Sequence, residues 1–90
     1  MANIRLTPDE LRNYAKKLRK NREESIALAN SISRNINECA NSWSGNQRDK
    51  YVAQFEDIKP TLSNKLPSLI QEMAVALDAI AQNFENADNA

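Results

Sequence analysis

The feature that most constrains this chain is its only glycine, Gly45, which stands at the middle of 90 residues. No glycine or proline falls between Asp9 and Trp43, and apolar residues recur there with the spacing of one helix face. Glycine reaches backbone conformations that strain other residues, so it suits a turn between helices. The pattern predicts two long helices joined at Gly45.

The first helix has a clear start signal. Thr7 offers an N-cap hydroxyl, Pro8 fits the first helical position, and Glu10 follows three residues after the cap. We therefore predict a helix over 8–41 and a turn over 42–45. Arg22 and Ser25 interrupt its apolar stripe at inward-facing positions, and Cys39 falls on the stripe, where a small buried side chain is expected.

The second half carries a more regular apolar stripe, broken by two prolines. Pro60 and Pro67 each lack a backbone donor and disfavour helix in the residue before them. Because the stripe keeps its phase across both, we predict a helix over 46–85 that is kinked near 58–61. The tail, residues 86–90, is expected to fray.

The predicted fold is all-α, a single domain over residues 1–90 that forms an antiparallel two-helix hairpin. The second stripe is broader than one neighbouring helix can cover, so a second hairpin would close it into a four-helix bundle. The alternative is an irregular monomeric core. The residues predicted to form the hairpin or dimer interface are Leu11, Leu18, Ile32, Ile36, Tyr51, Phe55, Leu62, Leu69, Met73, Leu77 and Ile80.

Composition excludes several function classes. The formal net charge is zero, which argues against nucleic-acid binding. The chain has no histidine and one cysteine, so histidine-based catalysis and Cys/His metal clusters are excluded; we expect no enzymatic activity, no cofactor and no metal. No apolar run approaches a membrane span or a signal-peptide core, so stable membrane insertion and a cleavable export signal are not expected.

The motif Trp43-Ser44-Gly45, midway between two helical stripes, resembles the WXG family of ESAT-like proteins, small substrates of bacterial type VII secretion. The resemblance implies a helical hairpin that pairs with itself, antiparallel in the homodimeric members, or with a related hairpin. It also implies secretion of the folded protein, without a cleavable signal peptide, through a machine powered by an FtsK/SpoIIIE-type ATPase.

The family carries a C-terminal export signal, a tyrosine followed four residues later by an acidic residue. In this chain Phe84 stands at the tyrosine position and Asp88 at the acidic one. In antiparallel dimers of the family the turn motif of one chain lies near the tail of the other, which implies one composite recognition surface. Alternatively, Phe84 closes the apolar stripe and Asp88 lies in a solvated tail.

Three other functions stay open at this point. The chain could be a targeting partner that pairs with the helical N-terminal domain of a larger secreted toxin, and polar insertions such as Arg22 and Ser25 can select such a partner. It could also be a membrane-active amphipathic hairpin, although such helices usually have cationic polar faces. A cytoplasmic coiled-coil adaptor is the last option.

Overall fold

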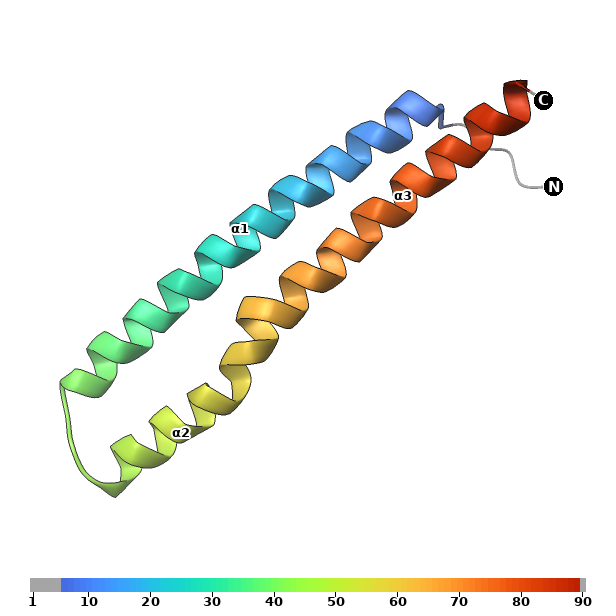
Figure 1. Cartoon of the computed structure of the whole chain (residues 1–90). Coiled ribbons are helices and arrows are strands. Elements are labelled where there is room, and N and C mark those ends of the chain that lie inside the picture. Colours follow the sequence, from blue (N-terminus) through green and yellow to red (C-terminus); the bar gives the residue numbers. More distant parts are fainter. Residues whose placement is uncertain (1–5, 90) are drawn as a thin grey trace.

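The computed structural model of the protein describes residues 6–89, with side chains described up to residue 87. Its first arm is α1 (Pro8–Asn41); the second arm is formed by α2 (Asn46–Pro60), the π-helical segment η1 (Thr61–Lys65) and α3 (Leu66–Asn89). The two arms run antiparallel in a rod of 67 × 19 × 17 Å, with the turn at one end and the start of α1 and the end of α3 at the other (Figure 1). The predicted all-α hairpin is confirmed.

Both ends of α1 are capped by local hydrogen bonds. The hydroxyl of Thr7 accepts the backbone N–H of Glu10 at 3.1 Å, as the sequence predicted. At the other end, the N–H of Ser42 donates to the carbonyl of Cys39 at 3.1 Å, and its hydroxyl donates to the carbonyl of Glu38 at 3.0 Å. These bonds satisfy backbone groups that a helix end leaves unpaired, and they fix where α1 begins and ends.

The arms pack through a narrow seam of mostly small side chains. The buried apolar residues are Leu11, Ala15, Ala29, Ala40, Phe55, Ala74 and Ala81. Ala15, Ala74 and Ala81 are 0% exposed, and such small side chains let two helices approach closely. Within residues 6–89, no large side chain is fully buried, so the seam alone makes a thin core.

The irregular segment of the second arm lies at 61–65, not at the predicted 58–61. Pro60 ends α2 and η1 follows at once, ending two residues before the buried Pro67. In η1 the N–H of Leu66 donates to the carbonyl of Thr61, five residues back. A proline ring clashes with the carbonyl four residues before it, so the widened turn makes room for Pro67.

Two further expectations are wrong. The helix was predicted to end at 85, but α3 continues to Asn89. Cys39 was expected to be buried, but it is exposed, because the seam at this end of α1 passes through its neighbour Ala40. Across residues 6–89, no helix combines the length and apolar character that crossing a membrane requires.

Candidate functional site

One flank of the hairpin is closed by two ion pairs between α1 and α3. Arg12 forms a bidentate pair with Glu85, in which Nη2 donates to Oε2 at 3.1 Å. Arg19 donates from Nη2 to Oδ2 of Asp78 at 2.6 Å. Residues seven apart lie on the same side of a helix, so both pairs belong to one flank, which we call the ion-paired flank.

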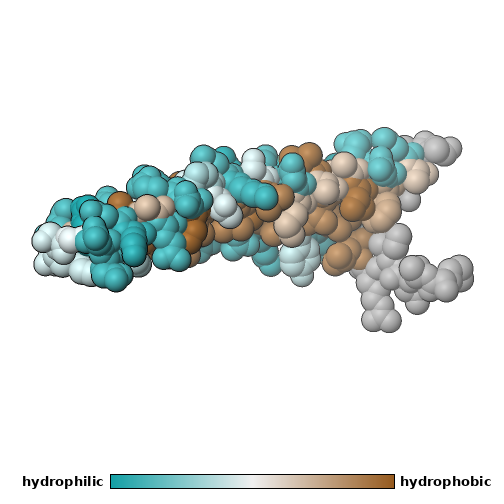
Figure 2. All heavy atoms as spheres, turned by 90° about the horizontal axis from the view of Figure 1, so that it is seen from below, coloured by the Kyte–Doolittle hydropathy of each residue, from teal (hydrophilic) through white to brown (hydrophobic). Residues whose placement is uncertain are grey.

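The opposite flank is apolar and open. Tyr14 follows Arg12 by two positions and Ile80 follows Asp78 by two, which places each about 200° around its helix from the ion pairs. The exposed side chains that share this side with Ile80 on α3 are Leu66, Leu69 and Met73, and Tyr14 and Leu28 lie there on α1. We call this surface the apolar flank. Apolar side chains gather along the half of the rod nearest the chain ends (Figure 2).

A groove of about 490 Å³ runs between the arms on the apolar flank. Its lining residues are Leu6, Leu11, Tyr14, Lys17, Leu18, Asn21 and Leu77. The ammonium of Lys17 lies 4.7 Å from the centre of the Tyr14 ring, so the one charged side chain in the lining rests against an aromatic face. The groove therefore offers an apolar surface to another molecule.

The eleven predicted interface residues divide between the seam and the solvent. Leu11 and Phe55 are buried. Leu18, Ile32, Ile36, Leu62 and Leu77 are half-buried. Tyr51, Leu69, Met73 and Ile80 are exposed. The second stripe is thus wider than α1 covers, and its uncovered part on α3 forms the apolar flank.

The turn at the far end is held by Gly45 and Arg48. Gly45 has φ +113°, a conformation that L-residues with a side chain rarely adopt. Arg48 donates from Nε to the carbonyl of Ala40 at 3.1 Å, which ties the start of α2 to the end of α1. The N–H of Asp49 donates to the carbonyl of Gly45 at 3.1 Å and opens α2. The turn is therefore a fixed structure with a defined surface.

Trp43 is exposed at the turn end of the hairpin. Its side chain is 44% exposed, and Ser44 is exposed beside it. Both line a mostly polar hollow together with the turn-holding Arg48. A large aromatic ring that is half in water suits a contact with another molecule better than a role in packing.

Phe84 and Asp88 lie at the opposite end of the rod from Trp43. Phe84 is half-buried, and it continues the inward-facing series of Leu77 and Ala81. Asp88 lies in the last turn of α3, so its backbone stands one turn beyond that of Phe84, but its side chain is outside the described residues. Within one chain, the structure does not bring the turn motif and the tail segment together.

The arginines of these contacts were missed by sequence reasoning. Arg19 belongs to the cationic run over residues 16–22, which the sequence predicts to be a solvated helix face, and Arg12 stands four positions before that run. Their partners on α3 are known only once the register of the two arms is known. The Arg12 guanidinium, by its hydrogen bond, lowers the pKa of the Glu85 carboxyl below its ordinary value.

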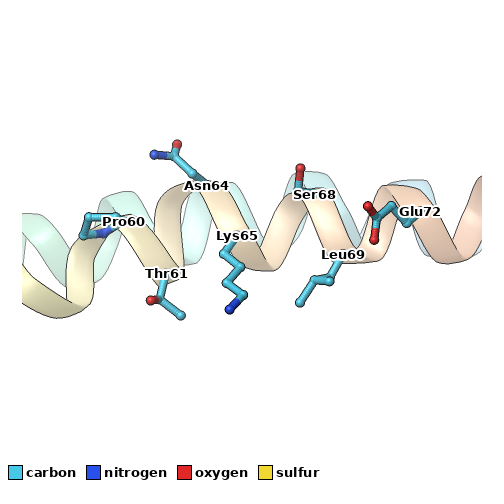
Figure 3. Close-up of a pocket in the computed structure, with 7 residues that line it drawn as sticks. All are labelled: Pro60, Thr61, Asn64, Lys65, Ser68, Leu69 and Glu72. Carbon is cyan, nitrogen blue, oxygen red and sulfur yellow. The ribbon is translucent and has the colours of Figure 1, made fainter.

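A further shallow hollow lies beside η1 and is lined by Pro60, Thr61, Asn64, Lys65, Ser68, Leu69 and Glu72 (Figure 3). All seven residues come from the second arm, so the hollow belongs to one helix surface and is not a cleft between elements. Among the residues that the structure describes, no group of three His, Cys, Asp or Glu side chains is placed to hold a metal ion.

Comparison with known proteins gives consistent matches along the chain. The family model WXG100, described as "Proteins of 100 residues with WXG", matches residues 3–89. The chain is 31% identical over 85 residues to Protein YukE of Bacillus subtilis, covering 94% of this chain and 87% of YukE. It is 27% identical over 88 residues to the ESAT-6-like protein SAG1039 of Streptococcus agalactiae, covering 98% and 91% of the two chains. The crystal structure of a secreted protein, EsxB of Bacillus anthracis, matches with a TM-score of 0.78 at 26% identity, covering 98% of this chain and 99% of that one.

Proposed function

The chain belongs to the WXG100 family, and from this we propose that it is a secreted, non-enzymatic substrate of a bacterial type VII (ESX-like) secretion system, exported as a folded homodimer. Its relatives support export, since the Bacillus anthracis protein of similar sequence and fold is described as secreted. In this proposal the chain acts through its surface, and its partners are a second copy of itself and an FtsK/SpoIIIE-type secretion ATPase.

The observation that carries the homodimer is the uncovered apolar flank. The chain exposes 6863 Å² of surface, whereas a compact monomer of 10.2 kDa exposes about 5,300 Å². The excess of about 1,500 Å² reflects the elongated shape of a single hairpin, and pairing along the apolar flank would bury part of it, since a standard interface buries roughly 800 Å² on each partner. A second hairpin laid on this flank would complete a four-helix bundle.

The proposed recognition surface combines the turn of one copy with the tail of the other. Trp43, Ser44 and Gly45 mark one end of the rod, and the Phe84–Asp88 segment marks the other. In an antiparallel dimer these two ends lie side by side at each end of the bundle. A folded substrate can then be recognised by a few side chains at fixed positions.

A second candidate function rests on Arg22. This residue is half-buried on the seam side of α1; its Nη1 donates to Glu23, but its Nε is buried and has no hydrogen-bond partner. A buried donor without a partner costs free energy, and another molecule that supplied an acceptor would recover it. This favours the alternative in which the chain pairs with the helical N-terminal domain of a larger secreted toxin.

The test is export from living cells. The chain is expressed in a bacterium with a type VII system, and in the same strain lacking the FtsK/SpoIIIE-type ATPase, and culture medium is compared with cell pellet. We expect the protein in the medium of the first strain alone, while a cytosolic marker stays in both pellets. Equal amounts in both media, or none in either, would overturn the proposal. Export that appears only when a toxin gene is co-expressed would establish the alternative.

A further inference from the structure

The last two turns of α3 are tied to the first turns of α1 by one side chain, Arg12. Its guanidinium binds both carboxylate oxygens of Glu85, and Nη2 also donates to the amide oxygen of Gln82 at 3.4 Å. Gln82 in turn donates from Nε2 to the side-chain oxygen of Asn86 at 3.1 Å. Arg12 therefore organises a polar network that spans residues 82–86.

Apolar packing does little to hold this segment. Among the α3 side chains that the structure describes, up to residue 87, Ala81 is the last buried one, and the half-buried Phe84 is the last apolar one before Ala87. A helix end made of polar residues frays unless something holds it. Yet α3 remains helical to Asn89, although the sequence predicted fraying from 86.

The Arg12–Glu85 pair lies close to the free ends of both helices. Four positions before Arg12 stands Pro8, the first residue of α1, and four positions after Glu85 stands Asn89, the last residue of α3. At this end of the rod, the last turns of α3 reach beyond the first turn of α1 (Figure 1). Arg12 is the cation of α1 nearest to this end of the rod, and its contacts with Glu85 and Gln82 hold the end of α3 to α1.

We propose that Arg12 is a positioning residue: by binding Glu85 and Gln82 it keeps residues 82–89 helical and docked on α1, so that Phe84 and Asp88 are presented one turn apart on a fixed surface. The inference rests on the proposed function in one respect, since it takes the Phe84–Asp88 segment as part of the recognition surface. The ordering of the segment itself does not depend on that function.

The experiment compares Arg12→Gln with the matched control Arg19→Gln. The control removes the second ion pair, which lies on the same flank about two helical turns further from the end than Arg12, but leaves the tail network intact. Amide hydrogen exchange is measured for residues 82–89 and, as an internal reference, for 70–77. In Arg12→Gln the tail amides should exchange about three to five times faster than in the wild type, the size of effect that a half-exposed ion pair gives. In Arg19→Gln the tail should exchange as in the wild type.

A charge swap tests whether the contact, and not the side chain alone, is responsible. The double variant Arg12→Glu with Glu85→Arg should restore slow exchange, whereas each single change should not. Export of the same variants is then measured, and Arg12→Gln should lower it while Arg19→Gln leaves it unchanged. Unchanged tail exchange in Arg12→Gln, or a loosened tail with full export, would overturn the proposal. If the wild-type chain shows no ATPase-dependent export, the proposed function fails, and the exchange data still decide whether Arg12 orders the tail.

Discussion

Arg19 on α1 and Asp78 on α3 form a 2.6 Å ion pair that repeats the pairing of Arg12 with Glu85, seven residues later on α1 and seven residues earlier on α3. The two pairs fix the register of the arms and close one flank of the rod with charge. They leave the apolar residues of α3, such as Met73 and Ile80, on the other flank, where these two side chains are 56% and 41% exposed. The asymmetry of these two flanks underlies the proposed dimer.

Acid should weaken the Arg12–Glu85 contact. The hydrogen bond from Arg12 lowers the folded-state pKa of Glu85 below the ordinary value of 4.5. A carboxyl with a lowered pKa adds stability above its unfolded-state pKa, and loses that contribution as the pH falls from 4.5 through the folded value. Urea unfolding of the wild type and Glu85→Gln should therefore show the variant to be less stable at neutral pH and equal in strong acid. Equal stability at neutral pH would contradict the assigned contact.

Truncation of Met73 should affect pairing and leave the hairpin intact. Its side chain is 56% exposed, so Met73→Ala should change the unfolding free energy of the monomer by about 0.5 kcal/mol or less. At high protein concentration, where the proposed dimer forms, Met73→Ala should lower the unfolding free energy further, because it also removes contacts between the two copies. The buried Phe55 is the opposite case, and Phe55→Ala should cost about 3–5 kcal/mol at every protein concentration.

Val75→Ala is the control for Met73→Ala. Val75 is 50% exposed but precedes Asp78 by three positions, which places it about 60° from that ion-pair residue and away from the apolar flank. Each protein is denatured at two protein concentrations, and the two curves are compared. The shift between them should be smaller for Met73→Ala than for the wild type and Val75→Ala. Identical concentration dependence in all three proteins would count against the flank as the dimer surface.

The turn should tolerate a methyl group at Gly45 sterically but not conformationally. A Cβ at Gly45 meets no atom within 4 Å, so the cost of Gly45→Ala comes from its φ of +113° and should be about 1–2 kcal/mol. A D-alanine at the same position, introduced by chemical ligation, has the mirrored preference and should restore most of the lost stability. If L- and D-alanine were equally destabilising, the cost would lie elsewhere than in the backbone conformation.

Trp43→Arg should damage export more than folding. The Trp43 side chain is 44% exposed at the end of the rod, so its loss removes little packing. Val75→Arg is a matched control, because Val75 is 50% exposed and lies away from both the turn and the apolar flank. Thermal melts should show similar small losses for both variants, and secretion assays should show a loss for Trp43→Arg alone. Full secretion of Trp43→Arg would remove the turn from the recognition surface.

The hairpin could be predicted from the sequence because its signals are local. The spacing of apolar residues, the cap at Thr7 and the lone glycine at 45 each act within a few residues, and together they define two arms and a turn. The two prolines correctly indicated an irregular second helix, but the position of the irregularity differed from the prediction. The widened turn forms before the buried Pro67, and the packing of Pro67 depends on the other arm.

The features that were missed depend on register. A stripe shows that α3 is apolar on two faces but not which face meets α1, so Leu69 and Leu77 could not be assigned to the open flank and the groove beforehand. For the same reason Cys39 was placed inside although it lies outside. The sequence could not show that residues 86–89 stay helical, because Glu85 is held by Arg12, a residue far away in the sequence.

The most direct test of the account is the mass of the purified chain in solution by sedimentation equilibrium across a range of micromolar concentrations. The proposed homodimer should appear as a species of twice 10.2 kDa that dissociates on dilution, and Met73→Arg on the apolar flank should shift it to monomer. A mass of 10.2 kDa at every concentration would contradict the homodimer.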